Sequence, residues 1–400
     1  MTESKYEELR LGDLVSRLES GVSVRADGAP PATGEVGVLK VSCLTGGRFD
    51  ATESKRVPTG QIPSLASPVR KGRVIISRSN TPELVGLCAY VSADHPNLFL
   101  PDTLWQMKFS EERESDPRWL AYLLSSPAYR EQLSRNASGT SANMKKLQKS
   151  SLLRMKIRVP PLPEQRKIAE ILRTWDEAVE KLEALQAAKQ KRLDGLTHAL
   201  IFGKLGMNGQ RQNWQLRRLS EVTFELTTRN TNLDMGHAAV MGATKVRGIV
   251  PMREQTIGGD LSRYKRLPPR AFAYNPMRIN VGSIAMNDRD EEVLVSPDYV
   301  VFGCAETGLA PDFLNHLRKT HWWSHHINIG GSGSVRMRTY YDDLAAMKLP
   351  LPAYEEQLEI VAVLNAAQED VKATEKASKA LTCQKRGLMQ KLLMGEWRVK

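Results

Sequence analysis

The sequence has few cysteines and no long apolar stretch. Its 400 residues include four cysteines, Cys43, Cys88, Cys304 and Cys383, which stand far apart without a Cys-x-x-Cys spacing. This distribution predicts neither a zinc knuckle nor a disulfide framework. No window comes close to the roughly twenty apolar residues of a membrane-spanning helix, and the residues at 1–5 lack the basic and apolar regions of a secretory signal. We therefore expect a cytoplasmic protein that makes no membrane contact.

The sequence also lacks the motifs of enzymes that act on DNA. It has no Gly-x-x-x-x-Gly-Lys-Ser/Thr phosphate loop, and residues 275–278 begin like an Asn-Pro-Pro-aromatic methyltransferase site but lack its second proline and its aromatic residue. His321 and His325 have no acidic or cysteine partner at metal-ligand spacing, so a helix with Trp322 and Trp323 packed inward explains that segment better. The acidic run at 288–292 lacks the glycine of a calcium loop. Nothing predicts catalysis or a metal site in this chain.

One stretch occurs twice. A displacement of 192 positions pairs like residues over about forty positions: Glu164 with Glu356, Gln165 with Gln357, Ile168 with Ile360, Leu172 with Leu364, Val179 with Val371 and Leu196 with Leu388. Such an internal repeat predicts a tandem duplication. Pro-Leu-Pro precedes both copies, and the extra residues Ala353, Tyr354 and Glu355 predict an insertion that alters the start of the second.

Both copies have the pattern of a long helix. Apolar residues recur with a seven-residue stripe, and no proline follows Pro163 or Pro352 within either copy. About thirty-eight residues would make a rod of roughly 57 Å. We expect the two helices to pack on each other and to separate two globular domains. The stripe residues that we assign to packing and partner docking are Ile168, Leu172, Trp175, Val179, Leu182, Leu196, Ile360, Leu364, Val371, Leu381 and Leu388.

The positive charge is concentrated outside these helices. The net charge of +12 divides into +6 for residues 1–159, 0 for 160–201, +5 for 202–352 and +1 for 353–400. Two basic domains on a neutral rod are typical of a protein that touches a polyanion at two places, and duplex DNA is the first candidate. A basic surface without a ligand remains the alternative.

The first domain reads as short strands and short helices. Strands are predicted at 36–41, 73–77, 84–91 and 104–109, and helices at 119–124 and 128–133, because the apolar runs are bounded by turn residues. A loop of small polar residues at 136–143 then leads to two lysines. Hydroxyls, amides and cations of this kind reach phosphates and base edges, although a solvated connector explains the loop almost as well. The candidate DNA contacts are Arg78, Ser79, Asn80, Thr140, Ser141, Asn143, Lys145 and Lys146.

The second domain repeats this plan with other residues. Strands are predicted at 240–246 and 249–250, with further strands and turns at 271–281 and 293–302. Arginine pairs with guanine and asparagine with adenine through two hydrogen bonds, which makes Lys245, Arg247, Asn275, Arg278, Arg336 and Arg338 the candidate readers here. Each cation could instead pair with an acid of its own domain. Shared scaffolds with different loops predict readers of two different sequences.

Several segments together resemble the specificity subunit of type I restriction-modification systems. They are the Pro-Leu-Pro-Glu-Gln helix at 160–201 and its partner at 349–394, Val38-Leu-Lys-Val41 with Gly47-Arg-Phe-Asp50, Ser77-Arg-Ser-Asn-Thr81, Gly139-Thr-Ser-Ala-Asn-Met-Lys145, Thr244-Lys-Val-Arg-Gly-Ile249, Tyr274-Asn-Pro-Met-Arg278 and Val295-Ser-Pro-Asp-Tyr-Val-Val-Phe302. The likeness spans nearly the whole chain.

The resemblance implies an α+β fold with two target recognition domains joined by two long helices. These helices would form an antiparallel coiled coil in a pseudo-twofold repeat. The expected boundaries are 1–159 for the first recognition domain, 160–203 for the first spacer helix, 204–351 for the second domain and 352–400 for the second helix. Each domain would read half of an asymmetric, bipartite sequence in double-stranded DNA, and the helices would fix the distance between the halves.

The resemblance also implies partners that carry the chemistry. Two modification subunits would bring S-adenosylmethionine and methylate adenine, and restriction subunits would add ATP- and Mg²⁺-dependent translocation and cleavage. This chain itself would hold no cofactor. An interaction scaffold without sequence reading is the alternative function, and a self-contained nuclease or methyltransferase is disfavoured by the missing motifs.

Overall fold

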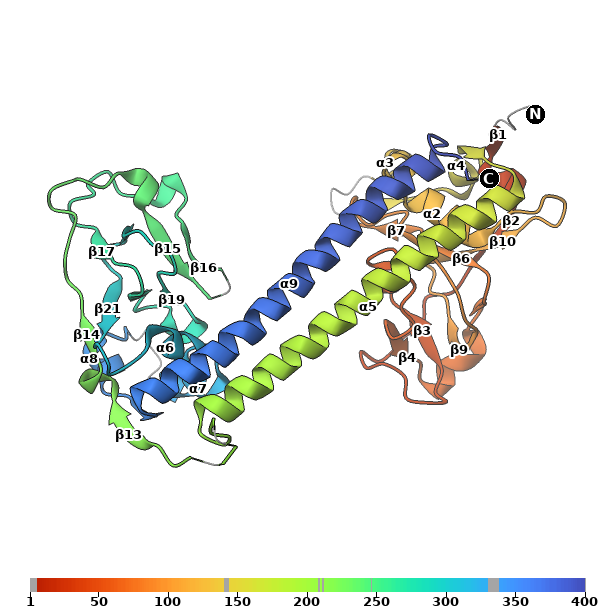
Figure 1. Ribbon diagram of the computed structural model, residues 1–400. Coiled ribbons are helices and arrows are strands. Elements are labelled where there is room, and N and C mark those ends of the chain that lie inside the picture. The colour runs from red at the N-terminus through yellow and green to blue at the C-terminus, as the bar shows by residue number, and fades with distance from the viewer. Residues whose placement is uncertain are drawn as a thin grey trace. The chain divides into compact units, whose positions relative to one another are not determined.

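The computed structural model describes residues 6–139, 144–207, 209–210, 212–245, 247–329 and 338–399. The chain forms two compact units, in which unit 1 comprises Met1–Leu182 with Ala377–Lys400 and unit 2 comprises Glu183–Lys376. Two 40-residue helices, α5 (Leu162–Ile201) and α9 (Tyr354–Leu393), contribute to both units (Figure 1). The predicted long helices are therefore confirmed.

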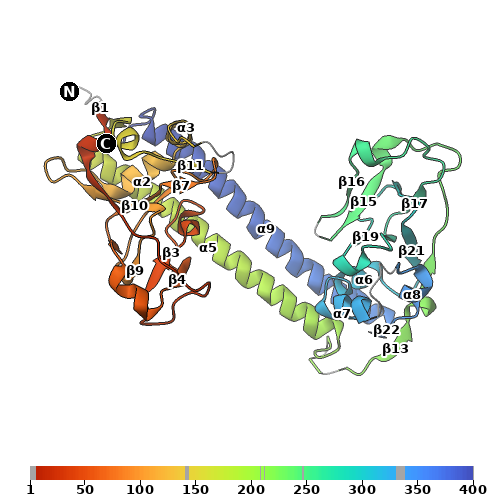
Figure 2. The ribbon, with the colours of Figure 1, turned by 180° about the vertical axis from the view of Figure 1, so that it is seen from behind.

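Unit 1 is built on a four-stranded antiparallel sheet in the order β2-β10-β6-β8, and a second sheet in the order β4-β3-β9-β5 extends from it on the side away from α3 (Figures 1 and 2). Its strands are β1 (Glu7–Arg10), β2 (Val15–Ser20), β3 (Gly37–Leu39), β4 (Ser54–Arg56), β5 (Pro68–Val69), β6 (Val74–Ser77), β7 (Ser79–Asn80), β8 (Cys88–Tyr90), β9 (His95–Phe99), β10 (Leu104–Phe109), β11 (Lys145–Lys146) and β12 (Lys156–Val159). Its shorter helices are α1 (Leu11–Leu14), α2 (Pro117–Ser125), α3 (Pro127–Arg135) and α4 (Lys149–Leu153).

Unit 2 repeats the first of these sheets, in the order β14-β21-β18-β19, and has the two-stranded sheets β15-β16 and β17-β20 where unit 1 has its second four-stranded sheet. Its strands are β13 (Gln215–Arg218), β14 (Thr223–Glu225), β15 (Met241–Thr244), β16 (Gly248–Pro251), β17 (Lys265–Leu267), β18 (Phe272–Tyr274), β19 (Ile284–Met286), β20 (Val293–Val295), β21 (Val300–Cys304) and β22 (Lys348–Leu351). Its shorter helices are α6 (Pro311–Leu317), α7 (His321–Ile329) and α8 (Tyr341–Ala345). The short pair β13-β22 corresponds to β1-β12 of unit 1.

The sequence predicted most of these elements, with some corrections at strand ends. The strand expected at 84–91 is shorter, since a turn occupies its first half and Gly86 adopts a φ of +73° before β8 begins. The segment expected at 271–281 ends as a strand at Tyr274 and continues as a turn with a 3₁₀ helix, η6 (Ile279–Val281). In α7, Trp323 is buried as predicted, whereas Trp322 is only half-buried.

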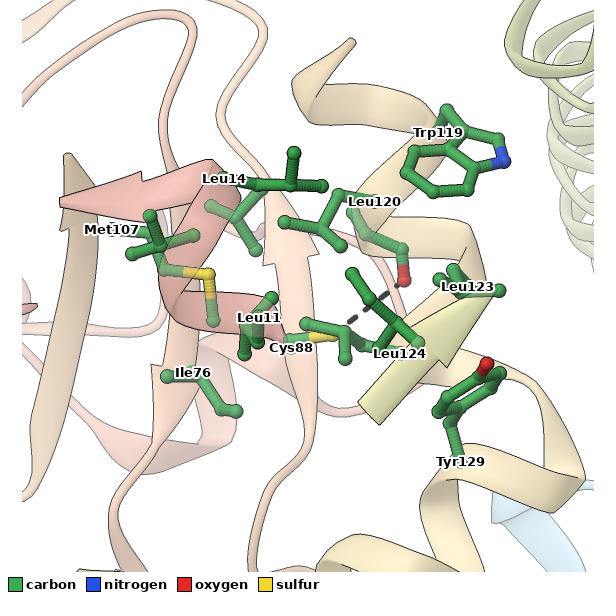
Figure 3. Packing of buried hydrophobic residues seen from close by; sticks show 14 of the residues in the cluster. Leu11, Leu14, Ile76, Cys88, Met107, Trp119, Leu120, Leu123, Leu124 and Tyr129 are labelled. Atoms are coloured by element: carbon green, nitrogen blue, oxygen red, sulfur yellow. Dashed lines mark hydrogen bonds between the residues drawn. The ribbon is translucent and has the colours of Figure 1, made fainter. Parts of the chain in front are cut away.

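The core of unit 1 lies between its four-stranded sheet, α1, α2 and the two long helices. Leu11, Leu14 and Trp119 are fully buried there (Figure 3). Met389, Leu392 and Leu393 of α9 belong to the same cluster as Ile168 and Leu172 of α5. The last turns of α9 therefore complete a core whose first residue is Leu11. In unit 2, Leu193 and Leu200 of α5 share a cluster with Ile360, Leu364 and Val371 of α9.

The two long helices run antiparallel in each unit, and polar contacts fix their pairing. In unit 1, Lys385 of α9 forms an ion pair of 2.5 Å with Asp176 of α5. In unit 2, Lys189 of α5 donates to Asp370 and Thr374 of α9 at 2.7 and 2.9 Å. The predicted stripe residues Ile168, Leu172, Val179, Ile360, Leu364 and Val371 are buried, and Trp175, Leu182, Leu196, Leu381 and Leu388 are half-buried. The predicted packing of the stripe is confirmed.

The insertion predicted before the second helix is wrong. Both helices begin at equivalent positions of the repeat, and so do β12 and β22. Pro350 lies inside β22 opposite Leu216, in a two-stranded sheet that tolerates a residue without an N–H. The residue equivalent to Pro160 is therefore Pro352. The Pro-Leu-Pro at 350–352 is equivalent to residues 158–160 and not to the Pro-Leu-Pro at 161–163.

The repeated glutamine explains why both helix starts are the same. Gln165 Oε1 accepts from the Asp116 N–H at 2.9 Å, and its Nε2 donates to the Pro160 carbonyl at 2.9 Å. Gln357 accepts from the Ala310 N–H at 2.8 Å and donates to the Pro352 carbonyl at 3.1 Å. Since Asp116 and Ala310 are the N-caps of α2 and α6, each glutamine ties the start of a long helix to its own domain.

Glu164 has a further role in unit 1. Its buried carboxylate accepts two hydrogen bonds of 2.8 Å from the Arg398 guanidinium and one of 3.5 Å from the Tyr6 hydroxyl. Burial, followed by the charge of Glu164, raises the pKa of Tyr6 to about 12. These contacts fasten both a residue before β1 and a residue after α9 to the first turn of α5.

Candidate nucleic-acid interface

In unit 1 the structure brings together five of the residues predicted to contact DNA. Strand β7 pairs with β11, so Asn80 lies opposite Lys145 and Ser79 opposite Lys146. Arg78 immediately precedes β7, and its carbonyl accepts a 2.9 Å hydrogen bond from the Leu147 N–H, directly after β11. Residues 65 and 67 positions apart in the sequence thus form one cationic patch. The predicted Thr140, Ser141 and Asn143 lie outside the described residues.

The patch borders an open pocket of about 940 Å³ whose floor includes Trp105. The Arg78 guanidinium and the Lys149 ammonium lie 5.6 and 5.7 Å from the centre of this indole ring. Lys149 and Ser20 also line a neighbouring pocket that contains Arg17 and Arg70. The two pockets therefore form a continuous basic surface along β2. Sequence reasoning missed Arg17, Arg70 and Lys149, although Lys149 follows the predicted lysine pair closely.

In unit 2 the corresponding loops meet through the same backbone contact. The Thr339 N–H donates to the Pro276 carbonyl at 3.1 Å, as Leu147 does to Arg78 in unit 1. Pro276 thus takes the place of Arg78. Asn275 and Arg338 line a pocket of about 300 Å³ together with Lys265, whose pKa is lowered by burial, and the acidic residues Glu225, Asp298 and Asp342 line it too. Arg336 lies outside the described residues.

The remaining predicted readers of unit 2 occupy two neighbouring loops. Lys245 and Arg247 lie in the turn between β15 and β16, and Arg278 lies in the turn after β18. The Ser283 hydroxyl donates to the Ala243 carbonyl at 3.0 Å and so ties the segment after η6 to strand β15. A Cβ atom at Gly282 would lie 2.8 Å from Cγ and Cδ of Lys245, so the lysine stem covers this glycine. Lys245, Arg247 and Arg278 are exposed.

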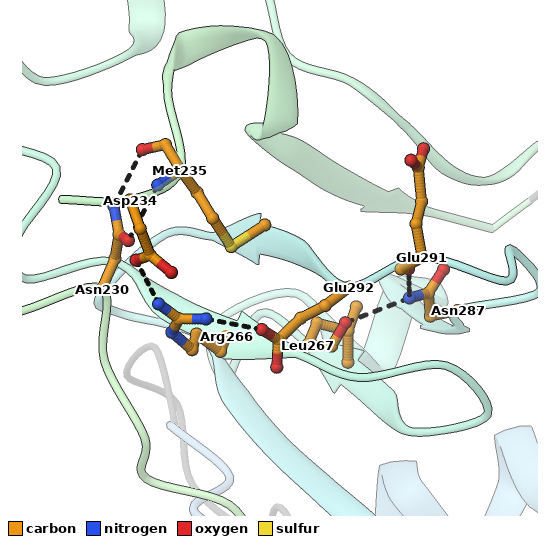
Figure 4. Close-up of polar contacts among 8 residues, drawn as sticks. All are labelled: Asn230, Asp234, Met235, Arg266, Leu267, Asn287, Glu291 and Glu292. Atoms are coloured by element: carbon orange, nitrogen blue, oxygen red, sulfur yellow. Dashed lines mark hydrogen bonds and ion pairs between the residues drawn. The ribbon is translucent and has the colours of Figure 1, made fainter. Parts of the chain in front are cut away.

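These exposed cations differ from the structural arginines of the same unit. Arg266 forms ion pairs with Asp234 and, at 2.8 Å, with Glu292 (Figure 4). Within the part of the chain that the structure describes, no carboxylate lies within 4.0 Å of a charged nitrogen of Lys245, Arg247 or Arg278. Among the described residues, these three cations therefore form no ion pair with an acid of their own domain. Unpaired, exposed cations are suited to phosphate and base contacts.

The described residues give no structural indication of a metal site or a membrane span. Among them, no three His, Cys, Asp or Glu side chains are grouped to hold a metal ion. None of the described helices has both the length and the apolar composition that crossing a membrane requires.

Comparison with known proteins identifies the family. Residues 3–190 match the family described as the type I restriction modification DNA specificity domain. The first half of the chain therefore carries this specificity domain. Over 356 residues it is 23% identical to a putative type I restriction enzyme MjaX specificity subunit from Methanocaldococcus jannaschii, covering 82% of this chain and 79% of that relative.

Solved structures show that the fold of this family extends over the whole chain. The S subunit of a type I restriction-modification system from M. genitalium superimposes with a TM-score of 0.58 at 15% identity, covering 98% of both chains. A chain from a structural study of complex assembly and conformational transition of the type I R-M system gives 0.56 at 19% identity, again covering 98% of both chains. The specificity-subunit architecture of two domains and two long paired helices is thus confirmed.

Proposed function

We propose that this chain is the DNA-reading subunit of a type I restriction-modification complex, in which unit 1 and unit 2 each bind one half of a bipartite target. The observation that carries the proposal is the repeated loop contact. In unit 1 it presents Arg78, Ser79 and Asn80, and in unit 2 it presents Pro276, Met277 and Arg278. One scaffold holding different side chains at equivalent positions is suited to reading two different sequences.

In this proposal the chain is not catalytic, and partner subunits carry the reactions. Two modification subunits bind the long helices and methylate adenine with S-adenosylmethionine. Restriction subunits add ATP- and Mg²⁺-dependent translocation and cleavage. Each long helix has 40 residues, a length of about 60 Å, which exceeds the roughly 34 Å between half-sites one helical turn apart. The helices therefore serve as the spacer between half-sites.

Methylome sequencing tests this function. A host that carries this gene with its methyltransferase gene is compared with the same host after deletion of this gene alone. We expect methyladenine in an asymmetric motif of two short specific sequences separated by unspecified bases, and we expect the motif to disappear with the deletion. Methylation that persists unchanged would favour a scaffold that does not read DNA.

A further inference from the structure

Two large apolar side chains are exposed in the cationic loop region of unit 2. Met277 is 46% exposed and Val281 is 63% exposed, and both lie in the turn between β18 and β19 that also contains Arg278. Scattered exposed apolar residues are normal. Here, however, they share one short turn with an unpaired arginine. The backbone contact that the two units share makes Pro276 equivalent to Arg78. Ser79 of unit 1 therefore stands at the position of Met277.

The turn is held in one conformation by several hydrogen bonds. The Asn275 Oδ1 accepts from the Met277 N–H at 2.9 Å, and the Arg278 carbonyl accepts from the Ser283 and Val281 N–H groups at 3.0 and 3.2 Å. Ile279, between the two exposed residues, is 3% exposed and anchors the turn in the core. The exposed side chains are therefore presented on a fixed support and lose little backbone entropy when they bind.

The surroundings of the turn favour a nucleic acid as the ligand. Lys245 covers Gly282 of the turn, and Arg278 lies within the turn. A ligand that fits this region must present negative charge on its outside and apolar surface between the charges. Duplex DNA has this arrangement, because its phosphates flank stacked bases whose faces become accessible when neighbouring base pairs separate. A protein partner would need acidic groups all around a small apolar patch.

We propose that Met277 and Val281 form an apolar wedge that enters between two neighbouring base pairs of the half-site bound by unit 2. The proposal rests on the proposed DNA-reading function and deepens it. Arg278 and Lys245 hold the phosphates beside the opened step, while the two apolar side chains replace part of the lost base stacking. Specificity at this step then arises from how easily the sequence unstacks, in addition to hydrogen bonds to base edges.

The test uses the complex of the full chain with its methyltransferase and the duplex target found by methylation mapping. 2-Aminopurine is placed at successive positions of the second half-site, other than the methylated adenine, because its fluorescence rises when it is unstacked. We expect the wild-type complex to raise the fluorescence at one step and the Met277→Ala/Val281→Ala variant not to do so. A mismatch at this step should tighten wild-type binding about tenfold, since the unstacking cost is already met, but variant binding less than about twofold.

Matched variants separate the wedge from other effects. Leu216→Ala removes an equally large side chain that is 66% exposed on β13, at the opposite end of unit 2 from the β15–β16 hairpin (Figures 1 and 2), and it should behave as wild type. Met277→Leu keeps an apolar side chain and should retain the fluorescence signal. An unchanged signal in the double variant would overturn the wedge while leaving DNA reading intact. A double variant that no longer assembles with the methyltransferase, but whose binding to DNA is unchanged, would also overturn the wedge. Met277 and Val281 would then belong to a surface that binds a protein. A wild-type complex without sequence preference would overturn the proposed function itself.

Discussion

Replacement of Gln357 by alanine should loosen the attachment of unit 2 to the start of α9. The side chain is completely buried and has three backbone partners: it accepts from the Ala310 N–H at 2.8 Å and donates to the Gly308 and Pro352 carbonyls, both at 3.1 Å. Each buried backbone group that loses its partner costs about 1–3 kcal/mol. If each of the three groups costs about 1–2 kcal/mol, the lower half of that range, Gln357→Ala should cost about 3–6 kcal/mol.

The equivalent variant in unit 1 supplies an internal comparison. Gln165 has two backbone partners, the Asp116 N–H and the Pro160 carbonyl. The same reasoning gives about 2–4 kcal/mol for Gln165→Ala. Gln190→Ala is the control, because Gln190 is exposed and contacts only the Asp194 side chain of its own helix, and it should change stability by less than about 0.5 kcal/mol.

Hydrogen exchange measured by mass spectrometry suits this comparison, since a two-unit chain need not unfold in one step. Gln357→Ala should speed exchange in α6 and the first turns of α9 by roughly 100-fold, and leave α2 unchanged. Gln165→Ala should act on α2 and the first turns of α5 instead. Exchange in α6 that changes less than about threefold in Gln357→Ala would refute the reasoning that orphaned backbone groups carry this cost.

Three further variants test separate features. Arg278→Ala should relax selectivity in the second half-site by about 1–3 kcal/mol per lost base contact, whereas Arg217→Ala, which removes the same charge at an ion pair with Glu221, should leave the methylation motif unchanged. Burial lowers the pKa of His316 below its ordinary 6.5, so the unfolded chain binds a proton at this residue more readily than the folded chain. Unit 2 should therefore lose stability as pH falls below about 6.5. Thermal melting measured over a pH series should show a smaller loss of stability for His316→Gln than for the wild type. Arg398→Ala leaves the buried Glu164 carboxylate without its ion pair and should speed exchange in β1 more than Glu164→Gln does; equal effects would contradict this.

The long helices were predictable because their apolar positions recur with a fixed period over many turns. The start of the second helix was not, since identical letters at Pro-Leu-Pro suggested an equivalence that β22 does not follow. A proline in a two-stranded sheet resembles a helix stop in sequence, and only the strand pairing with β13 distinguishes them.

The candidate site was predictable where its residues are adjacent in sequence and unpredictable where tertiary contacts assemble it. Arg78 and Lys145 were identified from their loops, and β7-β11 pairing brings them together. Arg17 and Arg70 were missed because they come from a strand and a turn that meet only in the folded sheet. The sequence could not show which arginines lack an acidic partner. Arg266 pairs with Asp234 and Glu292, which are distant in sequence and come close to it only in the folded chain, whereas Arg278 has no such partner among the described residues.

Helix α9 contributes to the cores of both units, and this affects the order in which the two units can fold during synthesis. Unit 2 is one continuous stretch, Glu183–Lys376, so all its contacts are available once that stretch has emerged. Unit 1 needs Met389, Leu392 and Leu393 against residues near Leu11, almost the full length of the chain away. Unit 1, although its first residues are made before unit 2, keeps part of its apolar surface uncovered until residues 389–393 have been made.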